Sequence, residues 1–340
     1  MIQPDPKDPY QWYFKDIVRS IEECGLADPP EKIFCENTDE FLAALNPNNA
    51  LWGYNKISTK WIFRGHYDSS WSLLPSSWRE ESIPVLKPFL DMAMQLRLDE
   101  SLNRNYENHG MIQNQVTFEE YEKQIRATMA EILMIQEFAK LANENGYFIK
   151  DIEKTLDVNN ISCAFDLNGV HFPNYATALA QHHGLPTRIL DWTRNPKIAA
   201  YFACEKPPSL DSDSICVHAL YTDTNYSIES SEALGNIKQF SVTRDQFPFL
   251  HAQDGLFTYI NSPPCDGIEY YYAWPDIHEC LSNRYRDQYG DSIRTIYLPE
   301  KYRQELLEKL AREGVTEITL KPGFNSISEH LLWAAENELL

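Results

Sequence analysis

The sequence lacks any long hydrophobic run and any basic leader. No stretch of about 18 consecutive apolar residues occurs, which is roughly the length that a membrane-spanning helix needs. The opening segment, MIQPDPKDPYQWYF, does not show the basic and then apolar order of a signal peptide. We therefore expect no membrane span and no export, and we predict a cytoplasmic location.

Closely spaced metal-binding cysteines are also missing. The chain has seven cysteines, an odd number, and no two of them have the C-x-x-C spacing of a zinc site. We interpret them as reduced and mostly buried thiols, and we expect neither a disulfide framework nor a metal cofactor. They are Cys24, Cys35, Cys163, Cys204, Cys216, Cys265 and Cys280.

Basic residues are scarce relative to acidic ones. The chain has 30 Lys and Arg against 50 Asp and Glu, which gives a formal net charge of −20. This charge repels polyanions and disfavours non-specific binding of nucleic acid by a broad basic surface. It is compatible with a local basic site, with a solvated acidic surface and with a basic partner.

Common nucleotide-binding and hydrolase motifs are absent. The sequence contains no G-x-G-x-x-G and no G-x-x-x-x-G-K-[ST], so Rossmann and P-loop nucleotide sites have no support. It also contains no G-x-S-x-G, the nucleophile turn of α/β-hydrolases.

The chain nevertheless has ample material for a folded core, because 43% of its residues are hydrophobic and 13% are aromatic. Strand patterns outnumber crossover helices and do not alternate regularly with them, so we predict an α+β fold with a mainly antiparallel or mixed sheet. Strands are predicted at 60–64, 188–192, 214–221, 255–260, 267–273, 294–298 and 315–320, and helices at 13–24, from Thr38, at 174–182 and at 299–313.

The predicted organisation is an N-terminal arm or helix over residues 1–32 followed by one domain over 33–335. A charged segment at about 82–150 interrupts this domain. Within it, apolar residues recur at helical spacing, which predicts a helical insertion that packs through this stripe. The stripe consists of Ile125, Met129, Ile132, Ile135 and Phe138.

The first candidate site is Phe63-Arg64-Gly65-His66. An arginine at the end of a predicted strand presents a rigid, planar donor set that suits phosphate or carboxylate. Gly65 is expected to end the strand and to let a ligand approach the backbone. An arginine paired with an internal acid would explain the same residues without a ligand.

The second candidate is the segment from Gln181 to Thr193 and on to Pro196. It places many polar groups in a turn between two apolar elements, and such density is typical of functional loops. Gly184 is expected to end the preceding helix, and Thr193 to cap the next one. Adjacent histidines on a helix point in different directions, so His182 and His183 are not predicted to bind metal. An ion pair of Arg188 with Asp191 that shapes the turn is the structural alternative.

These motifs resemble the FRG domain family, over roughly residues 33 to 330. The resemblance rests on Phe63-Arg64-Gly65, on Leu74-Pro75 with Arg79, on the segment 181–196 leading to 200–203, and on Ala252 to Phe257. Membership of this family implies a bacterial module of unassigned activity.

The order of the motifs is also similar to that of ADP-ribosyltransferases, which implies a sheet of that type and NAD as the substrate. In that resemblance Arg64 anchors NAD, Thr193 braces the site and Trp192 stacks on nicotinamide. Gln253 and Asp254 occupy the catalytic loop, where the sequence has no glutamate. The implied catalytic set is Arg64, Thr193, Gln253 and Asp254, and the implied NAD-binding set is Arg64, Gly65, His66, Gln181, His182, Thr187, Arg188, Asp191 and Trp192.

The leading hypothesis is an NAD-dependent ADP-ribosyltransferase that acts as a toxin or anti-phage defence effector on a nucleic-acid (RNA) or protein acceptor. A toxin of this kind implies a neutralising antitoxin. The alternatives are a non-catalytic FRG recognition module that binds a nucleotide or other phosphorylated ligand through Arg64, His182 and Arg188, and a polar cluster that is only structural.

Overall fold

The computed structural model describes most of the chain, and every structural statement below concerns the described residues. They are residue 3 and the ranges 11–24, 31–52, 61–96, 117–149, 173–206, 212–222, 237–242, 248–260 and 293–336. The predicted strand at 267–273 lies outside them. No helix in these ranges is both long and apolar enough to cross a membrane.

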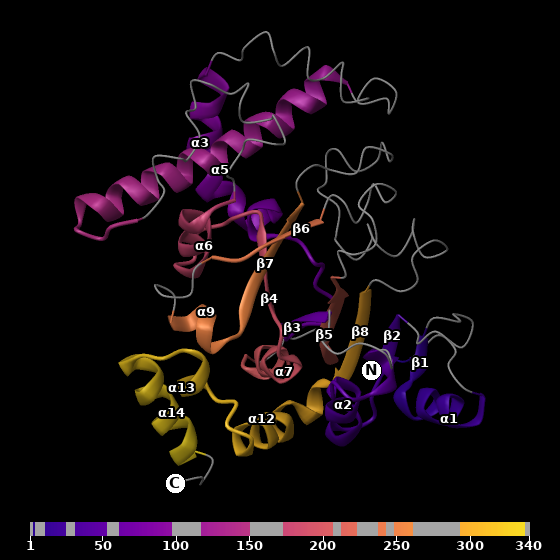
Figure 1. Cartoon of the computed structure of the whole chain (residues 1–340). Coiled ribbons are helices and arrows are strands. Elements are labelled where there is room, and N and C mark those ends of the chain that lie inside the picture. The colour runs from indigo at the N-terminus through magenta and orange to yellow at the C-terminus, as the bar shows by residue number, and fades with distance from the viewer. Residues whose placement is uncertain are drawn as a thin grey trace.

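The fold is α+β, built on a single mixed sheet, as the sequence predicts (Figure 1). Within the described residues the sheet has eight strands in the order β1-β2-β8-β5-β3-β4-β7-β6. The pairs β1–β2 and β2–β8 are parallel, and the other five are antiparallel. The strands are β1 (Gln11–Tyr13), β2 (Lys32–Phe34), β3 (Trp61–His66), β4 (Ile189–Thr193), β5 (Ser214–Tyr221), β6 (Ile237–Phe240), β7 (Gly255–Ile260) and β8 (Ile293–Pro299).

Helices pack around this sheet and extend beyond one end of it (Figure 1). The α-helices are α1 (Phe14–Cys24), α2 (Thr38–Leu45), α3 (Ile83–Gln95), α5 (Phe118–Glu144), α6 (Tyr175–His182), α7 (Pro196–Cys204), α9 (Pro248–Ala252), α12 (Arg303–Arg312), α13 (Glu317–Leu320) and α14 (Phe324–Glu336). Short 3₁₀ turns occur at Ala50–Trp52, Ser76–Trp78, Glu80–Ser82 and Glu300–Tyr302.

The hydrophobic core lies on both faces of the central strands, because successive residues of a strand point to opposite faces. Trp61 and Phe63 of β3 pack into a large cluster with α2, α7 and α12. Ile62, between them, packs with Leu190 and Trp192 of β4 on the other face. Burial on both faces fixes the N-terminal half of β3, which continues directly into residues 64–66 of the candidate site.

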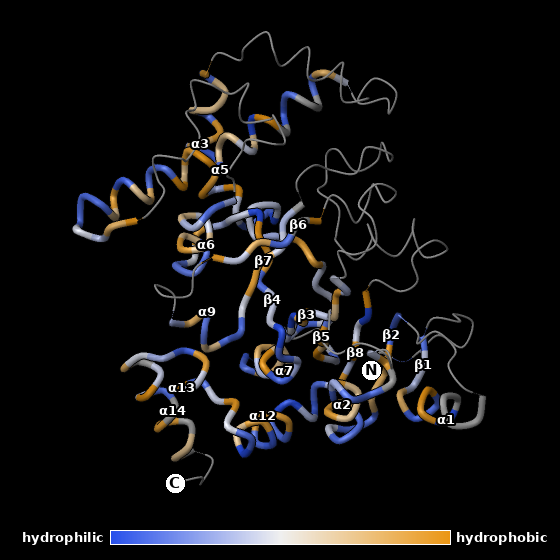
Figure 2. The backbone as a smooth tube through the Cα atoms, in the orientation of Figure 1, coloured by the Kyte–Doolittle hydropathy of each residue, from blue (hydrophilic) through white to orange (hydrophobic). Residues whose placement is uncertain are grey.

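The predicted helical insertion forms helices α3 and α5, which contact each other and lie away from the sheet at the top of Figure 1. In Figure 2 the tube of α5 alternates between hydrophilic and hydrophobic stretches. Its buried side chains include Ile132 and Ile135, which pack on α6 through Ala176 and Ala180. The predicted apolar stripe is therefore used for packing, and it attaches the insertion to the helix that precedes β4.

Three local features differ from the sequence predictions. Residues 317–320, predicted as part of a strand, form helix α13, because a capping box between Thr316 and Thr319 starts a helical turn there. The segment before Pro30 contributes a strand as well as a helix, and this strand, β1, pairs with β2. The strand β3 also continues through Gly65 to His66.

Gly65 does not end β3, and its role is in packing. A Cβ atom built on Gly65 would lie 1.9 Å from the carbonyl oxygen of Ala199 and 2.6 Å from the backbone nitrogen of Ala203. The absence of a side chain therefore lets α7 approach β3 at this point. The sequence suggested that a ligand approaches the backbone at Gly65, and in the structure helix α7 makes this close approach.

Candidate functional site

A cavity of about 550 Å³ opens where β3 and β4 diverge, and this size is within the range of small-molecule sites. The two strands pair at a single position, Phe63 with Thr193. Beyond this pair, β3 residues 64–66 and Asp191 of β4 line the cavity together with residues of α6, α7 and α9. We refer to it below as the main cavity.

Arg64 is held in the wall of the main cavity by two hydrogen bonds. Its Nη1 donates to the main-chain carbonyl of Asp191 at 2.8 Å, and its Nε donates to Nε2 of His66 at 3.1 Å. The Asp191 carboxylate lies 3.8 Å from Nη1, so an internal acid is also close. Burial lowers the pKa of Arg64 while Asp191 opposes this change, and an arginine stays charged at neutral pH. The guanidinium is therefore fixed in orientation, with Nη2 left without a protein hydrogen bond in the described part of the chain.

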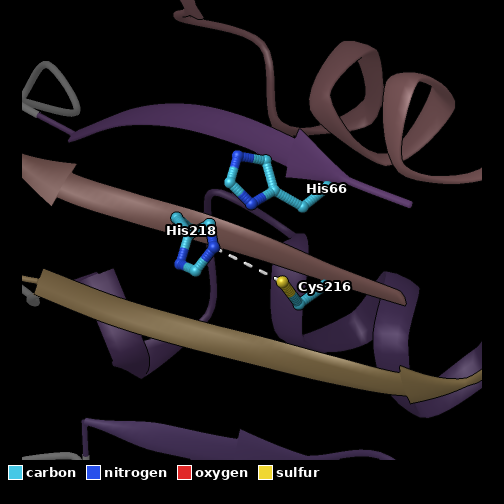
Figure 3. Close-up of side chains that lie close together, drawn as sticks. All are labelled: His66, Cys216 and His218. Carbon is cyan, nitrogen blue, oxygen red and sulfur yellow. Dashed lines mark hydrogen bonds between the residues drawn. The ribbon is translucent and has the colours of Figure 1, made fainter. Parts of the chain in front are cut away.

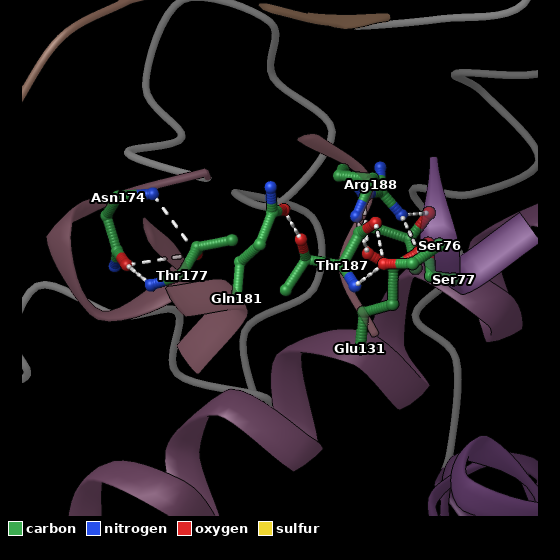
Figure 4. Close-up of polar contacts among 9 residues, drawn as sticks. Ser76, Ser77, Glu131, Asn174, Thr177, Gln181, Thr187 and Arg188 are labelled. Carbon is green, nitrogen blue, oxygen red and sulfur yellow. Dashed lines mark hydrogen bonds and ion pairs between the residues drawn. The ribbon is translucent and has the colours of Figure 1, made fainter. Parts of the chain in front are cut away.

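Gln181 links the end of α6 to β4. A capping box between Asn174 and Thr177 starts α6 (Figure 4), and Gln181 lies in its last turn. The Nε2 atom of Gln181 donates to the Asp191 carboxylate at 2.5 Å, while its Oε1 atom accepts a hydrogen bond from Thr187. The amide thereby orients a carboxylate that is itself largely exposed, with 59% of its side chain accessible.

Thr193 and Gln253 also line the main cavity and are hydrogen-bonded to each other. The Thr193 hydroxyl donates to the main-chain carbonyl of Gln253 at 2.7 Å, and Nε2 of Gln253 donates to the carbonyl of Leu320 at 3.1 Å. Thr193 does not cap α7. Asn195 does, by accepting from the backbone nitrogen of Lys197, while Thr193 accepts from the backbone nitrogen of Asn195.

His66 also lines the main cavity and accepts a hydrogen bond from Arg64. Burial lowers the pKa of His66 well below its usual value, and the positive charges of Arg64 and Arg79 lower it further. The ring is therefore neutral at physiological pH. His182 also lines the cavity, with its ring centroid 4.5 Å from that of Phe249, and burial lowers its pKa as well.

The main cavity is locally basic although the whole chain is acidic. Its lining includes four basic side chains and two carboxylates, which are Arg64, Arg79, Lys206, Lys321, Asp191 and Glu205. Cavities that concentrate one sign of charge raise the local concentration of oppositely charged ligands. The main cavity therefore favours a ligand with more than one negative charge.

Comparison with known proteins identifies one family. The FRG domain family matches residues 59–212. The chain contains an FRG domain. No curated protein and no solved structure matches the chain.

The FRG match includes the strand-end motif 63–66 and the segment 181–196, which the fold brings to the main cavity from two sides. Gln253 and Lys321 also line it and lie beyond the matched range. The cavity therefore also includes residues that follow the range matched by the FRG domain family.

Two predicted ligand-binding residues of the FRG domain do not line the main cavity. Arg188 is 5% exposed, and its Nε and Nη2 atoms donate to the two carboxylate oxygens of Glu131 on α5, both at 3.1 Å (Figure 4). Thr187 is 1% exposed and holds Gln181. The structural alternative, an ion pair of Arg188 with Asp191, was therefore wrong in the acid it named, because Arg188 pairs with Glu131. Only the fold reveals the true one, because Glu131 belongs to the inserted helix.

Asp254 also lies outside the cavity lining. It adopts a left-handed backbone conformation with φ of 45°, and its carboxylate lies 3.5 Å from Nη1 of Arg194. Of the two residues predicted for the catalytic loop, Gln253 lines the main cavity and Asp254 does not.

Trp192 contributes to the cavity lining, but its ring is only 3% exposed. The indole nitrogen donates to the Thr258 hydroxyl at 2.7 Å, and the ring packs with Leu190 and Leu256. It is therefore not available for stacking on a ligand. More exposed aromatic rings in the lining include Tyr67, Trp71, Phe202 and Phe249.

Glu205 and Lys321 also line the main cavity and were not predicted from the sequence. Glu205 follows α7, and its carboxylate forms an ion pair with Lys321, which lies just after α13. Burial lowers the pKa of Lys321, but the hydrogen bond to Glu205 and the attraction of Glu205 and Glu317 outweigh this effect and raise it overall. No motif marks this pair, because its two members are 116 residues apart.

Proposed function

We propose that the main cavity binds NAD and that the FRG domain transfers ADP-ribose from it to an acceptor. The observation that carries this proposal is the convergence of Arg64, Thr193 and Gln253 on one cavity. These residues come from three segments that the resemblance to ADP-ribosyltransferases assigns to NAD binding and catalysis. An ADP-ribosyltransferase-like arrangement of the central strands is part of the same proposal.

The charge and size of the main cavity support a dinucleotide ligand. A diphosphate carries negative charge that suits the fixed guanidinium of Arg64, with Arg79 also in the lining. The half-buried ring of Phe249 and the exposed ring of Trp71 offer apolar surface for the nicotinamide and adenine bases. The cavity volume of about 550 Å³ lies in the range of sites that enclose ligands of drug size.

The proposed reaction breaks the bond between C1′ of the ribose and the ring nitrogen of nicotinamide. The bonding electron pair leaves with nicotinamide, which departs as a neutral molecule, and positive charge develops on the ribose. An acceptor nucleophile then forms a bond to C1′ and loses its proton. A nearby carboxylate stabilises the oxocarbenium-like transition state and orients or deprotonates the acceptor.

Two carboxylates line the main cavity and support the proposal of this role. Asp191 is oriented by Gln181 and lies beside Arg64. Glu205 is oriented by Lys321. Because the loop at 253–254 offers no glutamate, we assign the electrostatic role to these two side chains and a positioning role to Gln253. The acceptor class, nucleic acid or protein, and a cellular role as toxin or defence effector with an antitoxin belong to the same proposal.

A second function, recognition without catalysis, is favoured by one observation. The side-chain amide of Gln253 is tied to the carbonyl of Leu320, so the residue in the catalytic position of the loop acts as a structural link. In this alternative the FRG domain binds a nucleotide or another phosphorylated ligand through Arg64 and its neighbours and performs no chemistry.

Nicotinamide release from NAD by the purified protein distinguishes these functions. The wild-type protein is compared with Arg64→Ala and with the control Arg194→Ala, whose guanidinium pairs with Asp254 outside the cavity lining. Each protein is assayed with and without cell lysate as a source of acceptors, and NAD binding is measured by calorimetry.

Release that requires Arg64 but not Arg194 supports the transferase, and labelled NAD then identifies the acceptor. NAD or nucleotide binding that requires Arg64, without release under any condition, supports the recognition module. Absence of both binding and release overturns the NAD proposal.

A further inference from the structure

Three potential metal ligands lie together on the face of the sheet that carries Arg64. In the antiparallel pair of β3 and β5, His66 is directly opposite Cys216, and His218 lies two residues farther along the same face of β5. Their ligand atoms all lie within 4.8 Å of one another, and all three residues are buried (Figure 3). Residues directly opposite one another in a sheet have closely spaced Cβ atoms, so this cluster is built on rigid elements.

The individual distances suit a cation. The Sγ atom of Cys216 lies 3.4 Å from Nε2 of His218. Zinc bond lengths of about 2.0–2.1 Å to nitrogen and about 2.3 Å to sulfur give tetrahedral ligand-to-ligand spacings of roughly 3.3–3.6 Å. Cys216 and His218 therefore already have the separation that a tetrahedral zinc site requires. The ligand atom of His66 lies no more than 4.8 Å from theirs, which exceeds that separation by about 1.5 Å at most.

The hydrogen bonds around His218 leave the appropriate ring nitrogen facing the cluster. Its Nδ1 lies 3.0 Å from the hydroxyl of Thr295 on β8, and its Nε2 faces Cys216. A second ring nitrogen engaged with a hydroxyl or carboxylate is the usual way that proteins orient a metal-binding histidine.

The ring of His66 also offers a nitrogen to the cluster. Its Nε2 accepts from Arg64, while its Nδ1 is buried and completes no hydrogen bond in the described part of the chain, although the main chain of Trp71 lies near the ring. Figure 3 shows one nitrogen of this ring on the side that faces His218 and Cys216. A buried polar atom without a partner is costly, and a ligand that binds it would remove this cost.

We propose that His66, Cys216 and His218 bind a divalent cation of the zinc class, with its fourth coordination position left to water or to an atom of a ligand. A thiolate with two imidazoles is a typical donor set for zinc. The site adjoins the main cavity through His66, which lines that cavity. The proposal of a cation site does not depend on the proposal that the main cavity binds NAD.

Some charges around the site favour cation binding and others oppose it. Burial raises the pKa of the Cys216 thiol, and the nearby buried carboxylate of Asp68 raises it further, so cation binding must displace the thiol proton. Once formed, the thiolate offsets one charge of the cation. Arg64 and Arg79 oppose the cation, as their effect in lowering the pKa of His66 shows.

Arg64 also competes directly for His66. A cation on Nδ1 requires the ring proton on Nε2, which can then no longer accept from Nε of Arg64. Arg64 keeps its bond to the Asp191 carbonyl in either state. Cation binding and the orientation of Arg64 are therefore coupled.

The test is titration of tag-free full-length protein with Co²⁺, which serves as a spectroscopic probe of a zinc site, followed by displacement with Zn²⁺. One equivalent of Co²⁺ should produce tetrahedral d–d bands and a thiolate-to-cobalt charge-transfer band. Cys216→Ser should abolish the charge-transfer band and weaken binding by at least about 100-fold, and Thr295→Val should weaken it by about 10–100-fold. Arg64→Ala should bind the cation more tightly than wild type.

Cys204→Ser is the matched control, since Cys204 is an equally buried thiol on α7 outside the cluster. It should bind like wild type. A wild-type protein that gives no charge-transfer band and retains no cation after dialysis overturns the proposal, whatever the variants do. A band that survives Cys216→Ser but is lost in Cys204→Ser overturns it equally. If Cys216→Ser does not fold, the wild-type spectrum and Thr295→Val still decide the question.

Discussion

The guanidinium of Arg64 donates from Nη1 to the main-chain carbonyl of Asp191 at 2.8 Å, at the place where β3 and β4 cease to pair. A side chain thus satisfies a strand carbonyl just where the strands diverge to form the main cavity. This bond fixes the donor geometry of Arg64 before any ligand arrives.

Replacing Arg64 by Lys should therefore remove function and largely preserve the fold. An ammonium cannot hold both the Asp191 carbonyl and a planar ligand group. We expect nicotinamide release or nucleotide binding to fall by about 100-fold or more, while the free energy of unfolding falls by only about 1–2 kcal/mol. Assays of activity together with urea unfolding check both parts. A large loss of stability with unchanged binding would show that Arg64 is structural.

Gly65→Ala should destabilise the protein strongly. The new Cβ would lie 1.9 Å from the Ala199 carbonyl oxygen, and the clash is with backbone, which cannot rotate away. We expect a loss at or above the roughly 3 kcal/mol that marks severe overpacking. Gly323→Ala is the control, because nothing lies within 4 Å of a Cβ at that position. Similar melting temperatures for the two variants would contradict the observed approach of α7 to β3.

Glu131→Ala should also be severe, although it lies outside the main cavity lining. It leaves the guanidinium of Arg188 buried without its carboxylate, which typically costs about 3–5 kcal/mol. Glu137→Ala on the same helix breaks only an exposed pair with Lys140 and should change stability by less than about 1 kcal/mol. Denaturant unfolding of both variants is the measurement. Equal effects would mean that the insertion is not anchored through Arg188.

Glu205→Gln tests the assignment of catalytic carboxylates. Under the transferase proposal this change removes negative charge near the ribose, so the rate of nicotinamide release should fall by about 10²–10³-fold, while NAD affinity changes little. Glu313→Gln, which removes the exposed partner of Lys197, serves as the control. A decrease in affinity with an unchanged rate would assign Glu205 to binding and leave Asp191 as the remaining carboxylate.

Acid should destabilise the protein through His66. Burial lowers the pKa of His66 in the folded state, so the unfolded chain binds the proton more readily, with a pKa of about 6.5. Stability is therefore complete above about pH 6.5 and is lost as the pH falls below it, by at most about 1.4 kcal/mol per pH unit for one group. Melting temperatures measured between pH 7.5 and 5.5, with chelator present, should decrease less in His66→Gln than in wild type. His251→Gln, at an exposed position, should keep the wild-type slope.

The sequence alone determined the local elements and most of the residues that meet in the main cavity. Hydrophobic periodicity and capping chemistry were enough to place β3, α6, β4, α7, β5 and β8, because these signals act over a few residues. The density of polar groups at 181–193 and the strand-end Arg64 pointed to the cavity for the same reason.

Only the tertiary structure determined which residues pair with one another. Arg188 pairs with Glu131, Glu205 with Lys321, and His66 with Cys216, and each pair joins segments separated by more than 50 residues. No local pattern encodes such pairs, because they depend on strand register and on how helices dock. The same reason explains Gly65, whose missing side chain is required by a helix that the sequence places 131 to 139 residues later.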